Sequence, residues 1–144
     1  GGNMGMGDAF GNGSYGMGFC LPRLDQALSA LLIDLKERGM LKNTLVVVTG
    51  EFGRTPNVLT QTPPGRQHWP SCFSSILAGA GIARGKVYGM SDKHAAYVTN
   101  NPVGPEDFAA TIYHALDVPI SDPQSNSGIF RPLTTGKPIL SLFG

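Results

Sequence analysis

The residues best suited to chemistry lie in two short segments, 50–56 and 65–70. Glu51 follows the glycine that ends a β-branched run, and His68 comes seventeen residues later. Carboxylate oxygen and imidazole nitrogen suit zinc, manganese or iron better than sulfur-selective metals. Two ligands do not complete a site, because catalytic zinc usually takes three protein ligands. The pair therefore indicates part of a divalent-metal site that needs further ligands from elsewhere.

A structural role explains the same residues. Glu51 could pair with Arg54 or Arg66, and His68 could pack beside Trp69 as a hydrogen-bonding side chain. In a functional interpretation, the guanidinium of Arg54 or Arg66 donates hydrogen bonds to two oxygens of a sulfate or phosphate group. Trp69 then stacks on a sugar, although an aromatic residue between histidine and proline is more often a packing anchor. The spacing is compatible with both the structural and the functional interpretation.

Other polar residues are weaker candidates. Asp92 and His94 could join a metal site, and a polar turn explains them equally well. Thr49 and Thr55 lie near the end of the β-branched run, where threonines are mostly strand and turn residues rather than nucleophiles. His114 falls off the apolar face of its helix and is expected to be solvated. We therefore find no convincing nucleophile.

The elements that position these residues alternate between helix and strand. Apolar residues at three- and four-residue steps predict a helix over residues 21–38, with its apolar stripe facing a core and Gly39 ending it. Residues 44–49 predict a continuously apolar strand of the kind covered on both faces in a parallel sheet. Helix, turn and strand make half of a βαβ unit, so we expect an α/β fold with its ligand edge at the loop 51–70.

The rest of the chain is less regular. Residues 1–18 hold eight glycines and three methionines and predict a flexible loop, so residues 1–20 are a loop or insertion and residues 21–144 the folded domain. Strands are predicted over residues 72–80 and 86–89, and a second helix over residues 105–116. Asp122 and Pro123 predict a turn, followed by short extended pieces at residues 129–133 and 138–143.

The composition excludes several classes of protein. A chain of 144 residues with 41% apolar residues can bury one core, and its net charge of +1 gives no electrostatic argument for nucleic acid or an anionic membrane. No apolar run is long enough to span a bilayer, and no signal peptide is visible. Cys20 and Cys72 allow at most one disulfide and lack the spacing of a zinc site.

Five ordered segments together resemble the DUF1501 family, and the resemblance covers residues 21–143. These segments are residues 24–47, 50–56, 65–70, 77–92 and 102–116. The family is placed among the alkaline-phosphatase-like hydrolases, beside sulfatases. The resemblance implies the C-terminal part of an alkaline-phosphatase-like sandwich, a mostly parallel sheet flanked by helices. It also implies Glu51 and His68 as ligands of zinc, manganese or calcium, and hydrolysis of a small-molecule or polysaccharide sulfate or phosphate ester.

Two departures from the family pattern qualify this expectation. Members usually carry a Trp-Asp-Thr-His-Gly motif shortly before the first helix, whereas this chain opens at Gly1 without it. We therefore expect a fragment whose partner is the N-terminal half of the same domain, which supplies the nucleophile, and we expect the isolated chain to be inactive. Gln67 replaces an aspartate that the family tends to have, which weakens a hydrogen bond to His68 or removes a possible metal ligand.

These departures support an alternative function, a non-catalytic carbohydrate- or partner-binding domain that retains the fold. A periplasmic or exported location is implied by the family alone.

Overall fold

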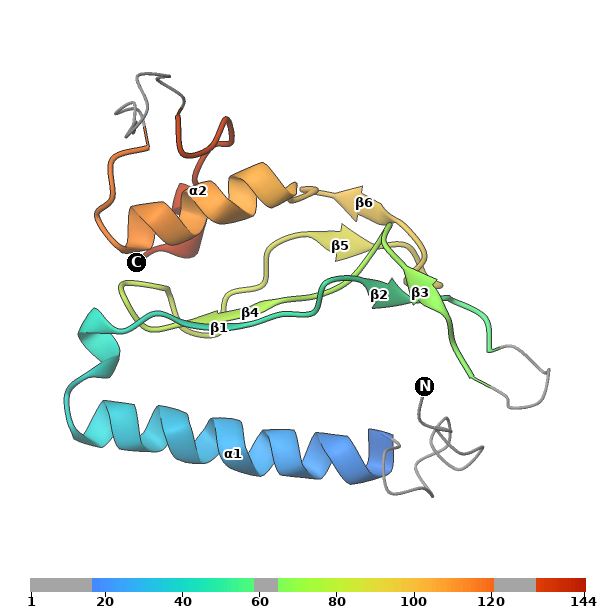
Figure 1. The fold of residues 1–144 in the computed structure, drawn as a ribbon, viewed down its shortest axis with the longest axis horizontal. Coiled ribbons are helices and arrows are strands. Elements are labelled where there is room, and N and C mark those ends of the chain that lie inside the picture. Colours follow the sequence, from blue (N-terminus) through green and yellow to red (C-terminus); the bar gives the residue numbers. More distant parts are fainter. Residues whose placement is uncertain (1–16, 59–64, 121–131) are drawn as a thin grey trace, which may run out of the picture. The chain divides into compact units, whose positions relative to one another are not determined.

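The computed structural model describes residues 17–58, 65–120 and 132–144 (Figure 1). The chain divides into two compact units. Unit 1 takes in the residues up to Gly39 together with Gly50–Ser74 and Ser91–Tyr97, and unit 2 takes in Met40–Thr49, Ser75–Met90 and Val98–Gly144. Each unit is therefore assembled from segments that are distant in the sequence.

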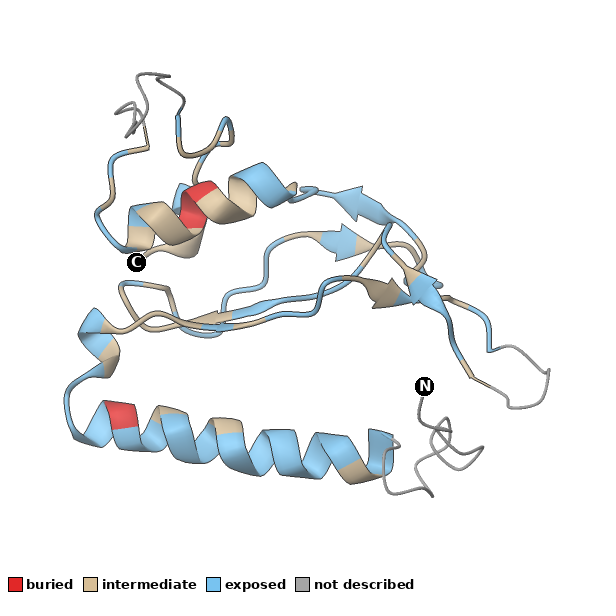
Figure 2. Cartoon of the chain, in the orientation of Figure 1, coloured by how far each residue is buried: buried red, intermediate tan, exposed pale blue. Residues whose placement is uncertain are grey.

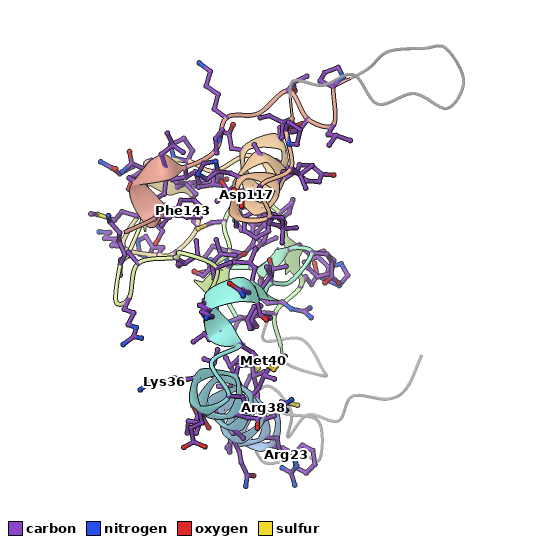
Figure 3. The ribbon with its side chains drawn as sticks, turned by 90° about the vertical axis from the view of Figure 1, so that its left-hand side faces the viewer. Arg23, Lys36, Arg38, Met40, Asp117 and Phe143 are labelled. Carbon is purple, nitrogen blue, oxygen red and sulfur yellow. The ribbon has the colours of Figure 1, made fainter. Side chains whose placement is uncertain are left out.

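Helix α1 of unit 1 spans Met17–Glu37 and begins inside the segment for which the composition predicts a loop. Pro22 consequently lies inside the helix, where it cannot donate a hydrogen bond to the preceding turn. Gly39 adopts a φ of 67° just beyond the end of the helix, as the sequence predicts. Figure 3 shows Lys36 and Arg38 at this end, where Arg38 forms an ion pair of 3.3 Å with Asp34.

The apolar stripe of α1 is buried over less of its length than its periodicity predicts. Only Leu35 is buried in this helix, and Leu28 and Leu32 are half-buried on the same line. Leu21 and Leu24 remain 49% and 48% exposed. Most of the α1 ribbon is accordingly pale blue in Figure 2. The expectation of a fully core-facing stripe is therefore wrong for the first half of the helix.

A short two-stranded ribbon follows in unit 1. Strands β2 (Gly53–Arg54) and β3 (His68–Trp69) pair antiparallel, with Gly53 opposite Trp69 and Arg54 opposite His68. The backbone N–H of Thr55 extends the ribbon by donating to the carbonyl oxygen of Gln67 at 2.9 Å. Gly53 faces the Cys72 carbonyl oxygen so closely that no side chain fits there. The ribbon thus holds Arg54, His68 and Trp69 on paired backbone.

The prediction of a mostly parallel sheet flanked by helices is wrong. In unit 2, β1 (Val46–Val48) pairs antiparallel with β4 (Ile76–Ala78), preceded by the 3-10 helix η2 (Leu41–Asn43). A parallel neighbour would require a crossover, usually helical, and none lies in the described residues between β1 and β4. Val47 is exposed while its two neighbours in β1 are half-buried, which is the alternation of a sheet with one open face.

The described strands form three two-stranded sheets, and the third pairs β5 (Met90–Ser91) with β6 (Val98–Asn100). The strand predicted over residues 72–80 is shorter than expected and is represented by β4. The strand predicted over residues 86–89 is wrong, because this segment is irregular and pairing starts only at Met90. Gly85 and Gly89 have φ values of 66° and 84° there, which regular strand geometry does not accommodate.

Helix α2 (Pro105–Ala115) confirms the second predicted helix, with proline at its start and Glu106 and Asp107 in its first turn. Its buried residues are Ala110 and Thr111. The extended piece predicted over residues 138–143 is instead largely a 3-10 helix, η3 (Leu140–Leu142). The Asp122-Pro123 turn lies outside the described residues, as does most of the piece at 129–133.

None of the described helices combines the length and apolar character that crossing a membrane requires, which agrees with the sequence.

Candidate functional site

One face of the β2–β3 ribbon gathers His68, Arg54 and Phe52. The imidazole of His68 stacks on the Phe52 ring with centroids 3.8 Å apart and planes inclined by 26°. The guanidinium of Arg54 lies 5.6 Å from the centroid of the same ring. Arg54 and His68 are cross-strand partners, so their side chains share a face. We refer to these three residues as the Phe52 face.

Glu51 lies in the bend that precedes β2, and its side chain is exposed. Its carboxylate forms no ion pair with Arg54 or Arg66, since the one ion pair among the described residues joins Asp34 and Arg38. Across residues 17–58, 65–120 and 132–144, no group of three potential metal ligands comes together. His68 thus contacts Phe52, the residue next to Glu51, and no third potential ligand from the described part of the chain joins them.

Arg66 has a backbone role in this structure. Its guanidinium donates hydrogen bonds to the carbonyl oxygens of both Thr55 and Pro56. The hydroxyl of Thr55 in turn accepts a hydrogen bond from the backbone N–H of Gln67 at 3.1 Å. Arg66 therefore fixes the loop that leaves β2, and Arg54 is the arginine better placed to meet an anion at the Phe52 face.

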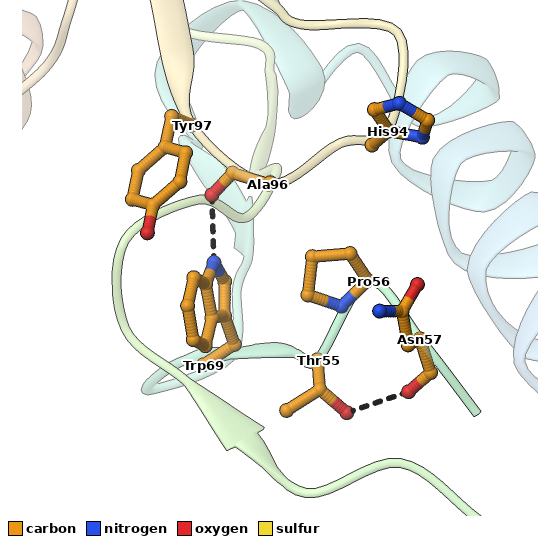
Figure 4. A pocket seen from close by; sticks show the side chains of 7 residues that line it. All are labelled: Thr55, Pro56, Asn57, Trp69, His94, Ala96 and Tyr97. Carbon is orange, nitrogen blue, oxygen red and sulfur yellow. Dashed lines mark hydrogen bonds between the residues drawn. The ribbon is translucent and has the colours of Figure 1, made fainter. Parts of the chain in front are cut away.

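Trp69 belongs to the other face of the ribbon, because successive strand residues point to opposite sides. Its indole N–H donates to the carbonyl oxygen of Ala96 at 2.6 Å, and its ring meets Tyr97 edge to face with centroids 5.6 Å apart. Here the structure forms a pocket of about 500 Å³, which we call the Trp69 pocket (Figure 4). Its lining consists of Thr55, Pro56, Asn57, Trp69, His94, Ala96 and Tyr97.

Asp92 organises the loop that supplies three of the seven residues lining this pocket. Its carboxylate accepts hydrogen bonds from the backbone N–H groups of His94 and Ala96, both at 2.9 Å, and of Tyr97 at 3.2 Å. Ala95 adopts a φ of 53° at the tip of this turn, a conformation that alanine rarely takes unless its surroundings enforce it. Asp92 is therefore occupied in positioning His94 and Tyr97.

The same hydrogen bonds act on the ionisation of Asp92. The backbone N–H of Ala96 lowers the pKa of the Asp92 carboxyl, burial opposes this effect, and the amides of His94 and Tyr97 and the nearby His94 imidazole lower it further. A carboxyl whose pKa is lowered by folding stabilises the folded loop above its unfolded pKa and loses this contribution as the pH falls through the folded pKa.

We accordingly expect the loop 92–97 to open on acidification, below the ordinary aspartate value of about 3.9. Amide chemical shifts and hydrogen exchange of His94, Ala96 and Tyr97, followed by NMR from pH 7 downwards, measure this transition. In Asp92→Asn the three amides should show no such titration. An identical titration in Asp92→Asn would assign the transition to another group.

Sequence reasoning identified Trp69 and His94 but missed the residues that complete their surroundings. Phe52 was not expected to stack on His68, and Asn57 and Tyr97 were not expected in a pocket. One usable signal existed, because an aspartate side chain favours a turn in which it accepts a hydrogen bond from the backbone two residues further on. Placing Tyr97 just beyond such a turn at Asp92 would have indicated an ordered aromatic.

Comparison with known proteins gives the family but no further relative. No curated protein and no solved structure matches the chain. The family model described as "Protein of unknown function (DUF1501)" matches residues 8–129, which covers both faces of the ribbon and helix α2. The chain therefore belongs to the DUF1501 family.

Proposed function

We propose that this protein is a metal-dependent hydrolase-like domain that acts on sulfate or phosphate esters. The observation that carries the proposal is the Phe52 face, where His68 and Arg54 lie together beside the segment that begins with Glu51. The proposed likeness to sulfatase-like hydrolases rests on the ordered sequence motifs alone, since the sheets of this chain are antiparallel pairs.

Glu51 and His68 fit a divalent metal by donor type. A carboxylate and an imidazole are ligands of zinc and manganese, and both side chains are exposed. The remaining coordination positions would be filled by water, substrate or residues outside the described ranges. When bound, the metal would polarise an ester oxygen and lower the pKa of a bound water molecule.

Arg54 would hold the ester group. A guanidinium presents donors in a planar fork that matches two oxygens of a sulfate or phosphate. The Phe52 ring lies beside both Arg54 and His68, so it limits the directions in which their side chains can turn. The residues of the Phe52 face would thus bind and orient the anion while leaving the ester's organic group directed outward.

Glu51→Ala and His68→Ala should each abolish stoichiometric metal binding. The metal affinity should fall by more than roughly 100-fold, because even the loss of a residue that hydrogen-bonds to a metal ligand lowers the affinity about 10–100-fold. The measurement is elemental analysis of the purified protein together with titration of zinc, manganese and calcium. Hydrolysis of 4-nitrophenyl sulfate and 4-nitrophenyl phosphate is followed in parallel.

Glu37→Ala is the matched control, because Glu37 is also exposed and lies at the end of α1. His94→Ala tests the weaker ligand candidate and should retain metal. A folded protein that takes up none of the three metals, or variants that bind them as tightly as Glu37→Ala, would overturn the proposal.

A second candidate function is a non-catalytic carbohydrate- or partner-binding domain. The Trp69 pocket favours it, since an aromatic pocket with few polar groups is typical of ligand-binding sites. Ligand binding without turnover of either ester, in a protein with metal bound, would favour this function over hydrolysis.

A further inference from the structure

The Trp69 pocket and the Phe52 face are separate sites on opposite sides of one ribbon. His68 and Trp69 are consecutive in β3 and therefore project to opposite faces. Trp69 is directed to Ala96 and Tyr97, whereas His68 is stacked on Phe52. A ligand in the Trp69 pocket consequently does not need the metal or the anion chemistry of the proposed function.

The lining of the pocket contains none of the lysine, arginine, aspartate or glutamate residues that would select an ionic ligand. In the view of Figure 4, Trp69 and Tyr97 lie on one side, His94 and Asn57 on the other, and Pro56 between them. A mainly apolar pocket with a few polar groups matches small-molecule sites, whose volumes are roughly 300–1,000 Å³. The preferred ligand is therefore neutral and has both apolar and polar surface.

Three polar side chains remain available for such a ligand. Within the described residues, Asn57 is hydrogen-bonded through its carbonyl oxygen, and His94 and Tyr97 through their backbone N–H groups. The Asn57 amide, the His94 imidazole and the Tyr97 hydroxyl can then donate or accept bonds from a ligand. The indole N–H is already bonded to Ala96, so Trp69 contributes its ring surface.

Aromatic ring surface together with three polar side chains matches the two kinds of surface on a sugar ring. A pyranose presents C–H groups on its faces, which pack on aromatic surface, and hydroxyls at its edge, which pair with amide, imidazole and phenol groups. A proline-rich peptide also uses aromatic surface, but it docks along a groove and presents few donors to the Asn57 and His94 side chains. The polar groups of the lining therefore favour the sugar.

We propose that the Trp69 pocket binds a neutral hexopyranose unit of an oligosaccharide, independently of the Phe52 face. Asp92 is a positioning residue for this site, because it holds the backbone of His94, Ala96 and Tyr97. The inference deepens the second candidate function and rests on it: it names a neutral hexopyranose as the ligand of the pocket and does not depend on hydrolysis.

The chain contains a built-in reporter for this site, since Trp69 is the only tryptophan among its 144 residues. The experiment titrates this 144-residue chain with neutral oligosaccharides, namely cellohexaose, laminarihexaose and mannohexaose, and follows tryptophan emission, with calorimetry as a second readout. At least one of them should change the emission saturably. Tyr97→Ala should weaken its binding by roughly tenfold, because the variant loses an aromatic ring that packs on the sugar.

Tyr88→Ala is the matched control, since Tyr88 is an exposed tyrosine outside the pocket. Tyr97→Phe retains the ring if the alanine variant misfolds, and it should lose less affinity than Tyr97→Ala. Absence of a saturable signal with all three sugars, or equal losses in Tyr88→Ala and Tyr97→Ala, would overturn the proposal. A signal given only by a polyproline peptide would do the same.

The two proposals can fail separately. Glu51→Ala should lose metal and retain sugar binding, whereas Tyr97→Ala should lose sugar affinity and retain metal. Sugar binding that disappears in Glu51→Ala would show that the two faces form one site and would contradict their independence.

Discussion

Replacing Gly53 with alanine should open the β2–β3 ribbon and disable the Phe52 face and the Trp69 pocket together. An added Cβ would overlap the carbonyl oxygen of Cys72 and approach that of Trp69 to 3.0 Å. Both obstacles are backbone atoms, so the clash is relieved only if the backbone of Gly53, Trp69 or Cys72 shifts, and we expect this shift to disturb the pairing of Gly53 with Trp69. Overpacking of this kind costs about 1–3 kcal/mol or more. The cost arises in the β2–β3 ribbon, which positions both His68 and Trp69.

Gly65→Ala is the control for this prediction. Gly65 lies shortly before β3, and a Cβ there would meet no atom of the described residues within 4 Å. Its free energy of unfolding should change by no more than about 0.5 kcal/mol. Chemical denaturation followed by Trp69 fluorescence measures both variants. Equal stability of Gly53→Ala and Gly65→Ala would mean that the ribbon does not pass as close to Cys72 as the structure has it.

The helices could be predicted because their signals are local. Pro105 and the acidic residues after it mark the start of α2, and Gly39 marks the end of α1. These residues act through capping and backbone geometry within a few positions, so no knowledge of the rest of the fold is needed. The start of α1 was missed because Pro22 looks like a first-turn residue and the glycines before it disfavour helix.

The direction of the strands could not be predicted in the same way. The continuous apolar run that contains Val46–Val48 fits a buried parallel strand, but an apolar run alone does not determine which segment pairs with it. That choice depends on β4, almost thirty residues later, and on the absence of a helical crossover among the described residues between them. Partner and direction are properties of the tertiary structure.

The sequence predicts the candidate site by residue type alone. It marks Glu51, Arg54, His68 and Trp69 as chemically capable residues in two neighbouring segments, and their roles stay predictions. Their environments depend on contacts with backbone atoms, such as those of Arg66 with the carbonyls after β2. Side-chain contacts with backbone leave no spacing pattern in a sequence, because every residue type offers the same carbonyl and N–H groups.

Thr111→Val should destabilise unit 2 through a single lost hydroxyl. Thr111 is only 1% exposed, and its hydroxyl donates to the Asp107 carbonyl oxygen at 2.7 Å while accepting the backbone N–H of Ile139 at 3.0 Å. The hydroxyl thereby links the segment before η3 to α2 by a hydrogen bond. Valine has nearly the same shape, so it leaves the Ile139 N–H without its acceptor at a cost of about 1–3 kcal/mol. Stabilities of whole domains are only about 5–15 kcal/mol, which makes this a large fraction.

Thr111→Ser separates the hydroxyl from the methyl group. Serine keeps both hydrogen bonds and loses one buried methyl group, which costs about 0.5–1.5 kcal/mol. Hydrogen exchange of the Ile139 amide distinguishes the two variants: it should accelerate strongly in Thr111→Val and stay close to the parent rate in Thr111→Ser, relative to amides in the middle of α2. If Ile139 exchanges equally slowly in Thr111→Val, the segment before η3 is held by packing on α2, and the hydroxyl bridge contributes little to the stability of unit 2.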